Sequence, residues 1–270
     1  MTTTVSGRKG LFMHKPVLGL KSHWSKEQLD TRLKLTPSLI EIYLANGDLE
    51  YRYDEVKDVC ESLRDKGIRI ILHQPLKFND EHINIAIGEC QQLIYSLECI
   101  EELDSLGFEF IMHPYNHYPE TEQWIDYTTD PKYKDHIALK RSSESLINTI
   151  LNYGSQNMYI ENVYLDVFSS ADDINYVIKK TNVKFCLDIS HLFLMDSKNF
   201  YSEFKKLKPD LLHINDASKV DDAIEVGKGL IDFSLLKLNV DGIVEVANKD
   251  DIRAVETIRS YNKIKDMYGY

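Results

Sequence analysis

Short apolar runs and helical stretches alternate along the chain about eight times. The runs are rich in β-branched and aromatic residues and are too short for buried helices, so they predict buried parallel strands. The predicted strands cover residues 17–21, 38–45, 68–73, 108–113, 158–161, 184–188, 210–215 and 242–247. Between them, apolar spacing predicts helices, the longest over residues 81–106. Eight strand–loop–helix units predict an α/β fold, a single closed (β/α)8 barrel of the TIM type.

The chain has 270 residues, and no linker or low-complexity segment divides it. We therefore predict one domain over residues 1–270, with residues 1–14 as a polar N-terminal extension. The connection over residues 114–136 is longer than the others. Its aromatic residues are Tyr115, Tyr118, Trp124, Tyr127 and Tyr133. Long connections inside compact domains are usually functional, so we expect this loop to cover the active-site face.

Charge and cysteine content narrow the classes of function. The formal net charge is −11, which disfavours a general nucleic-acid binder without excluding a local basic groove. No apolar stretch is long enough to span a bilayer. The four cysteines form no CxxC pair, so free thiols in a reducing compartment are expected. These features predict a cytoplasmic protein, and they leave the oligomeric state open.

Each predicted strand ends in a polar residue. These ends are His23, Asn46, His73, His113, Glu161, Asp188, His213 and Glu245. A single such residue is ordinarily a hydrogen-bonded barrel residue, but a buried carboxylate without a partner is costly. Active sites of these barrels lie at the C-terminal ends of the strands. The repetition therefore predicts a metal site or acid–base chemistry, and imidazole mixed with carboxylate suits zinc, manganese or cobalt rather than calcium.

Four motifs at the later strand ends carry a resemblance to a known family. They are Glu161-Asn162, Asp188-x-x-His191, His213-x-Asn215-Asp216 and Glu245. A further stretch runs from Gly227 to Phe233, with Lys228 where the family usually has glutamate. The chain resembles the xylose isomerase-like barrel superfamily, which contains endonuclease IV and the ketose 3-epimerases. The resemblance is strongest over residues 70–250.

This resemblance implies a set of metal ligands. Glu161, Asp188, His213 and Glu245 match the single-metal site of the epimerases. His73 and His113 match additional ligands of the endonuclease IV type, where Glu161 would bridge two ions. The nuclease pattern for a third ion includes a histidine where this chain has Ala223. One or two divalent ions per chain are therefore expected.

The first hypothesis for function is a metal-dependent isomerase or epimerase of a sugar or sugar derivative, acting through an enediolate. Glu161 and Glu245 would exchange the proton, and His191 would hold a substrate oxygen. The further candidates for contact with a small carbohydrate substrate are Asn162, Asp216, Lys228 and Trp124.

Two alternatives stay open. One is endonuclease IV-like cleavage of abasic DNA, which is favoured by three histidines, His73, His113 and His191. Ala223, and Gln74-Pro75-Leu76-Lys77 in place of the usual Pro-Tyr-Leu, speak against it. The other is an inactive barrel that binds a metabolite. Asp221 and Asp222 are equally well explained as a solvated pair or as ligands.

Overall fold

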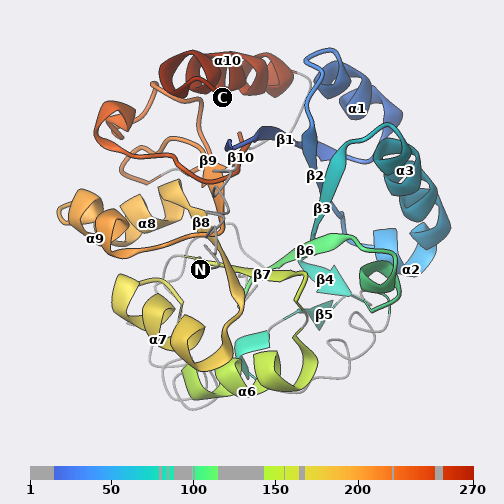
Figure 1. The fold of residues 1–270 in the computed structure, drawn as a ribbon, viewed down its shortest axis with the longest axis horizontal. Coiled ribbons are helices and arrows are strands. Elements are labelled where there is room, and N and C mark those ends of the chain that lie inside the picture. Colours follow the sequence, from blue (N-terminus) through green and yellow to red (C-terminus); the bar gives the residue numbers. More distant parts are fainter. Residues whose placement is uncertain are drawn as a thin grey trace, which may run out of the picture.

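The chain closes a barrel of eight parallel strands. A computed structural model describes residues 15–78, 81–83, 85–87, 99, 101–114, 143–154, 156–163, 168–220, 222–246 and 252–270. The strand order around the barrel is β1-β10-β9-β8-β7-β6-β3-β2, and every neighbouring pair is parallel. Figure 1 shows the strands at the centre and the helices around them. The predicted (β/α)8 barrel is confirmed.

The barrel strands lie within or close to the predicted runs. They are β1 (Leu18–His23), β2 (Leu39–Tyr43), β3 (Arg69–His73), β6 (Glu109–Met112), β7 (Met158–Glu161), β8 (Lys184–Asp188), β9 (Leu211–Ile214) and β10 (Gly242–Val244). The described helices are α1 (Lys26–Leu33), α2 (Asp48–Tyr51), α3 (Tyr53–Asp65), α6 (Ser143–Tyr153), α7 (Ala171–Thr181), α8 (Ile189–Met195), α9 (Phe200–Lys206) and α10 (Ile252–Tyr268). Two short 3₁₀ turns are η1 (Ile85–Ile87) and η2 (Phe233–Leu235).

The predicted helix over residues 81–106 is wrong at its start. Residues Lys77–Phe78 (β4) and Glu81–His82 (β5) pair instead as an antiparallel hairpin. The amide of Ile83 donates to the carbonyl of Leu76, which continues this pairing and satisfies backbone groups without a helix. Residues 101–105 are helical and end just before Gly107, whose φ of 82° favours glycine.

Side chains inside the barrel form layers because alternate residues of a strand face inward. A middle layer takes one residue from each of seven strands: Leu39, Ile71, Ile111, Tyr159, Cys186, Leu211 and Ile243. On β1 the corresponding residue is Gly19. A Cβ there would lie 2.6 Å from Cγ of Leu39, so glycine leaves room for that side chain. We call this middle layer the apolar floor, and the C-terminal ends of the strands lie directly above it.

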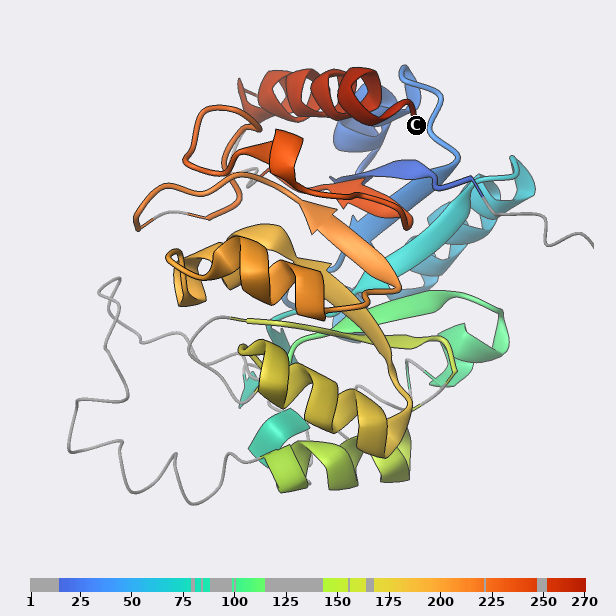
Figure 2. The ribbon, with the colours of Figure 1, turned by 60° about the vertical axis from the view of Figure 1, so that its left-hand side comes forward.

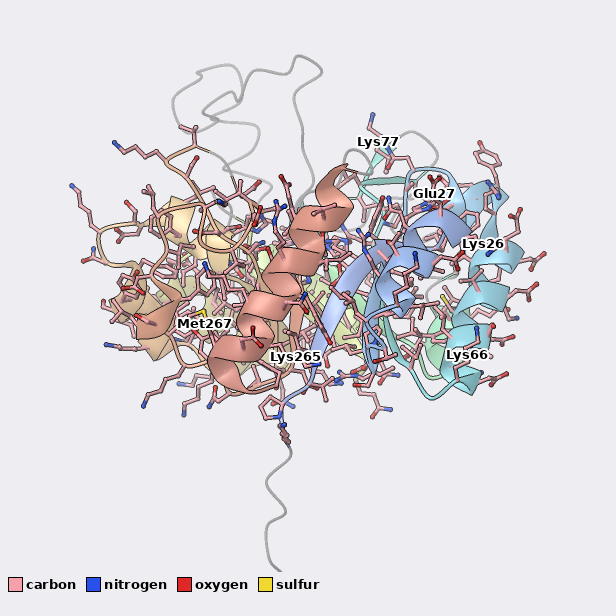
Figure 3. All side chains as sticks on the ribbon, turned by 90° about the horizontal axis from the view of Figure 1, so that it is seen from above. Lys26, Glu27, Lys66, Lys77, Lys265 and Met267 are labelled. Carbon is pink, nitrogen blue, oxygen red and sulfur yellow. The ribbon has the colours of Figure 1, made fainter. Side chains whose placement is uncertain are left out.

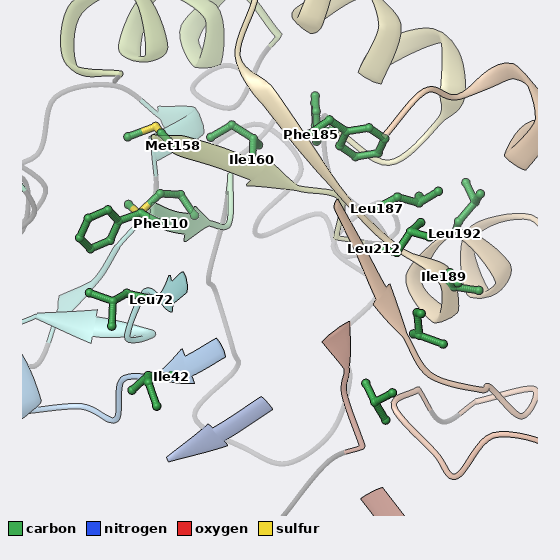
Figure 4. Close-up of a cluster of buried hydrophobic side chains, with 14 of the residues drawn as sticks. Ile42, Leu72, Phe110, Met158, Ile160, Phe185, Leu187, Ile189, Leu192 and Leu212 are labelled. Carbon is green, nitrogen blue, oxygen red and sulfur yellow. The ribbon is translucent and has the colours of Figure 1, made fainter. Parts of the chain in front are cut away.

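The larger core lies between the barrel and the helices. Outward-facing residues such as Ile42, Leu72, Phe110, Phe185 and Leu212 are at most 1% exposed. Figure 4 shows these side chains turned away from the barrel axis. In Figure 2, the last helix, α10, lies beside β1 and β10, where the last strand of the barrel meets the first.

The surface around the helices is charged. Figure 3 shows side chains of the outer helices and turns, including Lys26, Glu27 and Lys66, projecting from the molecule. None of the described helices has the length and apolar character that a membrane crossing would need.

The N-terminal extension (residues 1–14) and nearly all of the predicted lid (residues 114–136), including Trp124, lie outside the described residues. Their functions, and the single-domain organisation of residues 1–270, stay predictions.

Candidate metal centre

The inward residues one layer above the apolar floor are all polar. Each lies two residues beyond its neighbour in the middle layer, so each points into the mouth of the barrel. In chain order, they are Lys21, Glu41, His73, His113, Glu161, Asp188, His213 and Glu245. All eight strands therefore contribute one polar side chain to a single ring.

Four of these side chains converge as the sequence predicted. One donor atom from each of Glu161, Asp188, His213 and Glu245 lies within 4.8 Å of the other three. His213 Nδ1 is 2.8 Å from Glu245 Oε2 and 3.2 Å from Glu161 Oε2. Neither His213 Nδ1 nor Glu245 Oε2 makes a hydrogen bond among the described residues, although both are buried. These two atoms form an ion pair without a hydrogen bond of good geometry, and a cation between the converging ligand atoms would bind both of them.

A second group shares Glu161 with the first. His73 Nε2 and His113 Nε2 each lie 3.2 Å from Glu161 Oε2, and the three residues form a compact set of possible ligands. The two imidazole rings meet edge to face, with centroids 4.7 Å apart. The structure thus brings together all six residues that the sequence predicted as ligands, with Glu161 common to both groups.

Hydrogen bonds hold Asp188 in place. It caps the N-terminus of α8, where Oδ1 accepts from the amide of His191 and the hydroxyl of Ser190, both at 2.8 Å. Its Oδ2 accepts from the Asn215 amide at 2.8 Å. The Asn162 side chain bonds both backbone groups of Asp188, at 2.7 and 3.1 Å. Hydrogen bonds of this kind, from residues that would not touch the metal themselves, fix the orientation of a metal-binding side chain.

His191 stands at the edge of the centre. Its Nδ1 lies 2.8 Å from the Asn162 carbonyl oxygen and 3.4 Å from Glu161 Oε1. Its Nε2 faces Asp222 Oδ2 at 3.4 Å. The neighbouring Ala223 lines the same cavity and supplies no ligand atom there. Of the acidic pair 221–222, Asp222 therefore contacts His191, whereas Asp221 lies outside the described residues.

Two residues of the ring were missed from the sequence. Glu41 Oε2 lies 2.6 Å from His213 Nε2, so a carboxylate supports the far side of the imidazole. Lys21 Nζ lies 2.9 Å from Glu41 Oε1 and donates to Glu245 Oε1 at 2.6 Å. Glu41 lies inside the predicted run 38–45, whereas Lys21 ends the predicted run 17–21 but lies inside β1, which continues to His23. The available signal was a charge inside an apolar run at an inward-facing position.

The acidic ring shifts the pKa values of its members. Burial alone would raise the pKa of Glu161, but the charges of His213 and His113 hold it well below its usual range. Burial would lower the pKa of His213, but Cys186 and Glu41 beside it raise that pKa well above the usual value. Burial raises the pKa of Asp188. The crowded carboxylates thus favour positive charge at their centre, which a divalent cation would supply.

A cavity of about 470 Å³ opens above the ring. This volume is in the range of small-molecule sites, roughly 300–1,000 Å³. Its lining includes five of the six possible metal ligands, all but His213, and residues at the ends of β2 and β3 such as Tyr43, Asn46 and Gln74. The Gln74 side chain is buried, and neither its amide nitrogen nor its oxygen has a hydrogen-bond partner among the described residues.

The other predicted residues lie elsewhere. Asp216 is buried, and its carboxylate accepts from the amides of Ala217, Gly227, Gly229 and Ile231. That environment favours a structural part for Asp216. Lys228 is exposed, on the loop that these bonds hold.

The ends of the first two strands also differ from the ring. His23 Nδ1 accepts from the amide of Ser25, and its Nε2 lies 3.5 Å from Asp48. Asn46 lines the cavity, but its side-chain oxygen accepts from the amide of Lys77. Neither residue is among the possible ligands.

The fold and the converging donors define a (β/α)8 barrel with a candidate divalent-metal centre at its C-terminal end. A family model described as xylose isomerase-like TIM barrel matches residues 38–256, so the chain belongs to that family. No protein with a curated description matches the sequence.

Solved structures of this fold confirm the architecture. D-psicose 3-epimerase in the presence of D-fructose is 15% identical, with a TM-score of 0.61 over 94% of this chain and 100% of that one. Endonuclease IV from Thermus thermophilus is 14% identical, with a TM-score of 0.60 over 93% and 99%. The TTHB071 protein from Thermus thermophilus, soaked with ZnCl2, is 17% identical, with a TM-score of 0.58 over 91% and 98%.

Proposed function

We propose that this protein is a divalent-metal-dependent isomerase or epimerase that acts on a sugar or a sugar derivative. The observation that carries the proposal is the arrangement of Glu161 and Glu245. Each turns one oxygen toward His213 Nδ1, at 3.2 and 2.8 Å. Their other oxygens face different partners, His191 and Lys21. Two carboxylates therefore meet at one centre while each keeps an oxygen on a different side.

The proposed chemistry is a proton transfer at a carbon next to a carbonyl group. One glutamate removes the carbon-bound proton, and the other returns a proton to the opposite face, which inverts or moves the stereocentre. His191, at the edge of the cavity, holds a substrate oxygen. Asn162 and Asp216 act through the backbone that they fix. Contacts of Lys228 and Trp124 with substrate stay predictions.

A metal ion fits these ligand atoms, because His213 Nδ1 and Glu245 Oε2 are buried, lie 2.8 Å apart and have no hydrogen bond among the described residues. Glu161, Asp188, His213 and Glu245 would hold the first ion, and His73 and His113 with Glu161 would hold a second. Zinc, manganese or cobalt suits such nitrogen and carboxylate donors. When bound, the ion would polarise the substrate carbonyl as a Lewis acid.

The substrate class and location are part of the proposal. A cavity of about 470 Å³ suits a small carbohydrate. The described cysteines Cys60 and Cys186 are free thiols, which fits a reducing cytoplasm.

Endonuclease IV-like hydrolysis of abasic DNA is the second candidate. The observation in its favour is the second group, because His73 and His113 both approach the shared Glu161 oxygen at 3.2 Å. Against it stand Ala223 in the cavity wall and the acidic balance of the chain. A metabolite-binding barrel without activity is the minor alternative.

Solvent exchange tests the proposal directly. The metal-loaded protein is incubated with a panel of ketoses and aldoses in deuterium oxide, and incorporation of carbon-bound deuterium is followed by NMR. We expect incorporation with manganese, cobalt or zinc, and slow or no cutting of an abasic duplex. Efficient metal-dependent nicking without exchange on any sugar would reverse the order of the two candidates.

A further inference from the structure

Lys21 places a positive charge inside the mouth of the barrel. It lies on β1, in register with Glu41 of β2, and its side chain points in above Gly19. Among the described residues that line the cavity, Lys21 is the one lysine or arginine. The proton-transfer scheme above gives it no part.

The described contacts of Lys21, a hydrogen bond to Glu245 and an ion pair with Glu41, take up at most two of its three ammonium hydrogens. Nζ lies 2.9 Å from Glu41 Oε1 and 2.6 Å from Glu245 Oε1. An ammonium group has three donors and no acceptor. The side chain keeps 15% exposure and lines the cavity, so one N–H remains for a bound molecule.

Neutralising buried carboxylates would not by itself require a lysine in the cavity. Elsewhere in the barrel, Arg69 and Lys184 neutralise Glu109 at the N-terminal end of the strands, away from the cavity. Lys21 instead lies next to Glu245, one of the two proposed proton-transfer groups. A donor beside a base matches a carbonyl compound, whose oxygen and acidic C–H are carried by neighbouring carbons.

We propose that Lys21 is a catalytic residue that donates a hydrogen bond from Nζ to the substrate oxygen on which negative charge develops. When a glutamate takes the proton, the C–H electron pair forms a carbon–carbon double bond, and the carbonyl π pair moves onto that oxygen. Return of a proton by the other glutamate reverses both changes, so no oxidant or reductant is required. A fixed cation at the oxyanion lowers the barrier.

This inference rests on the proposed function and narrows it. The substrate is an α-hydroxy ketone or aldehyde, bound with its carbonyl oxygen toward β1. Hydrolysis of a phosphodiester breaks a P–O bond and removes no carbon-bound proton, so it makes no such use of Lys21.

The test removes Lys21 together with its buried partner. In the Lys21→Met, Glu41→Gln double variant the partner at position 41 is neutral as well, and the glutamine oxygen can still accept from His213. Glu245 loses its contact with Lys21 but keeps the one with His213 Nδ1. The reference is Glu41→Gln alone, which keeps Lys21 beside Glu245. Metal content and melting temperature are measured for both variants. A Lys21→Gln, Glu41→Gln variant repeats the comparison if the methionine variant is unstable.

We expect the double variant to bind metal as the reference does and to lose about 10²–10³-fold in kcat for deuterium exchange. KM should change much less. A hydroxamate analogue of the sugar, which imitates the oxyanion, should lose more affinity than the corresponding polyol.

Exchange within about 3-fold of the reference, with the same hydroxamate affinity, would overturn the inference while leaving the proposed function standing. Absence of exchange and of hydroxamate binding in the wild type would overturn both.

Discussion

The two ends of the barrel both carry charged side chains, but only one end balances them. At the N-terminal end, Arg69 pairs with Glu109 and Asp241, and Lys184 also reaches Glu109. The Tyr159 hydroxyl donates to Glu109 at 2.8 Å. Two cations thus meet two carboxylates, and the group closes the bottom of the barrel.

At the C-terminal end, the balance is reversed. Lys21 contacts two carboxylates, those of Glu41 and Glu245, and the same ring holds two more, Glu161 and Asp188, together with three imidazoles. Buried atoms there have no hydrogen bond among the described residues. Since burying unpaired charge is costly, the first cluster is explained by stability, whereas the excess of carboxylates in the second fits a bound cation.

The largest expected effect compares one glutamate from each end. Glu161→Gln should lower the rate of deuterium exchange by about 10²–10⁴-fold, since it removes a proton-transfer group, and should change stability much less. Glu109→Gln should leave the exchange rate almost unchanged and should lower the free energy of unfolding. Exchange rates, metal content and urea unfolding are measured on both. If Glu161→Gln and Glu245→Gln both turned over at the wild-type rate, the two-carboxylate mechanism would be wrong.

Metal removal should affect only the C-terminal end. Binding at 1,000 times Kd stabilises a folded protein by about 4 kcal/mol, so a chelator should lower Tm by on the order of 10 °C. Adding back zinc or manganese should restore it. Elemental analysis should find one or two ions per chain, and His73→Ala or His113→Ala should lose at most one. Three tightly held ions, or loss of all metal on removing His73 alone, would contradict this.

The N-terminal cluster should control acid stability. Burial opposes ionisation of Glu109, but hydrogen bonding to Arg69 lowers its pKa below the usual value. Its contribution is therefore complete above the unfolded pKa, about 4.5 for Glu, and is lost as pH falls through the lower folded pKa. Arg69→Met should lower the free energy of unfolding by about 1–2 kcal/mol at pH 7. It should also make that free energy fall less steeply as the pH decreases. Urea unfolding between pH 7 and 3 measures both effects. If the variant lost stability with falling pH as steeply as the wild type, the Arg69–Glu109 network would not be the source of the acid sensitivity.

The smallest effect is a gain in stability at the cavity. Gln74 buries an amide without a hydrogen-bond partner among the described residues, which costs about 1–3 kcal/mol. Gln74→Met keeps a similar volume and should raise the unfolding free energy by about 1 kcal/mol. Chemical denaturation without ligand is the measurement. A loss of similar size would mean that the amide supports the fold.

Much of this protein follows from the sequence because the periodicity of buried strands is local. The apolar runs predicted the barrel, and parallel strands bring their C-terminal ends to one edge, which explains why six predicted ligands meet. The helix over residues 81–106 failed at its start because a short hairpin satisfies the same backbone groups. Helix capping is equally local: the hydroxyl of Ser170 accepts from the amide of Asp173, three residues further on, and caps α7.

Tertiary structure alone decided which other polar residues join the centre. Lys21 and Glu41 lie inside strands, and whether such residues face inward depends on register and barrel closure. Only the folded chain shows that His23 pairs with Asp48 rather than entering the ring. Only the fold shows that four backbone amides occupy the Asp216 carboxylate. The sequence determined which side chains can bind a cation, but distances between strands far apart in the chain determined which of them can share one.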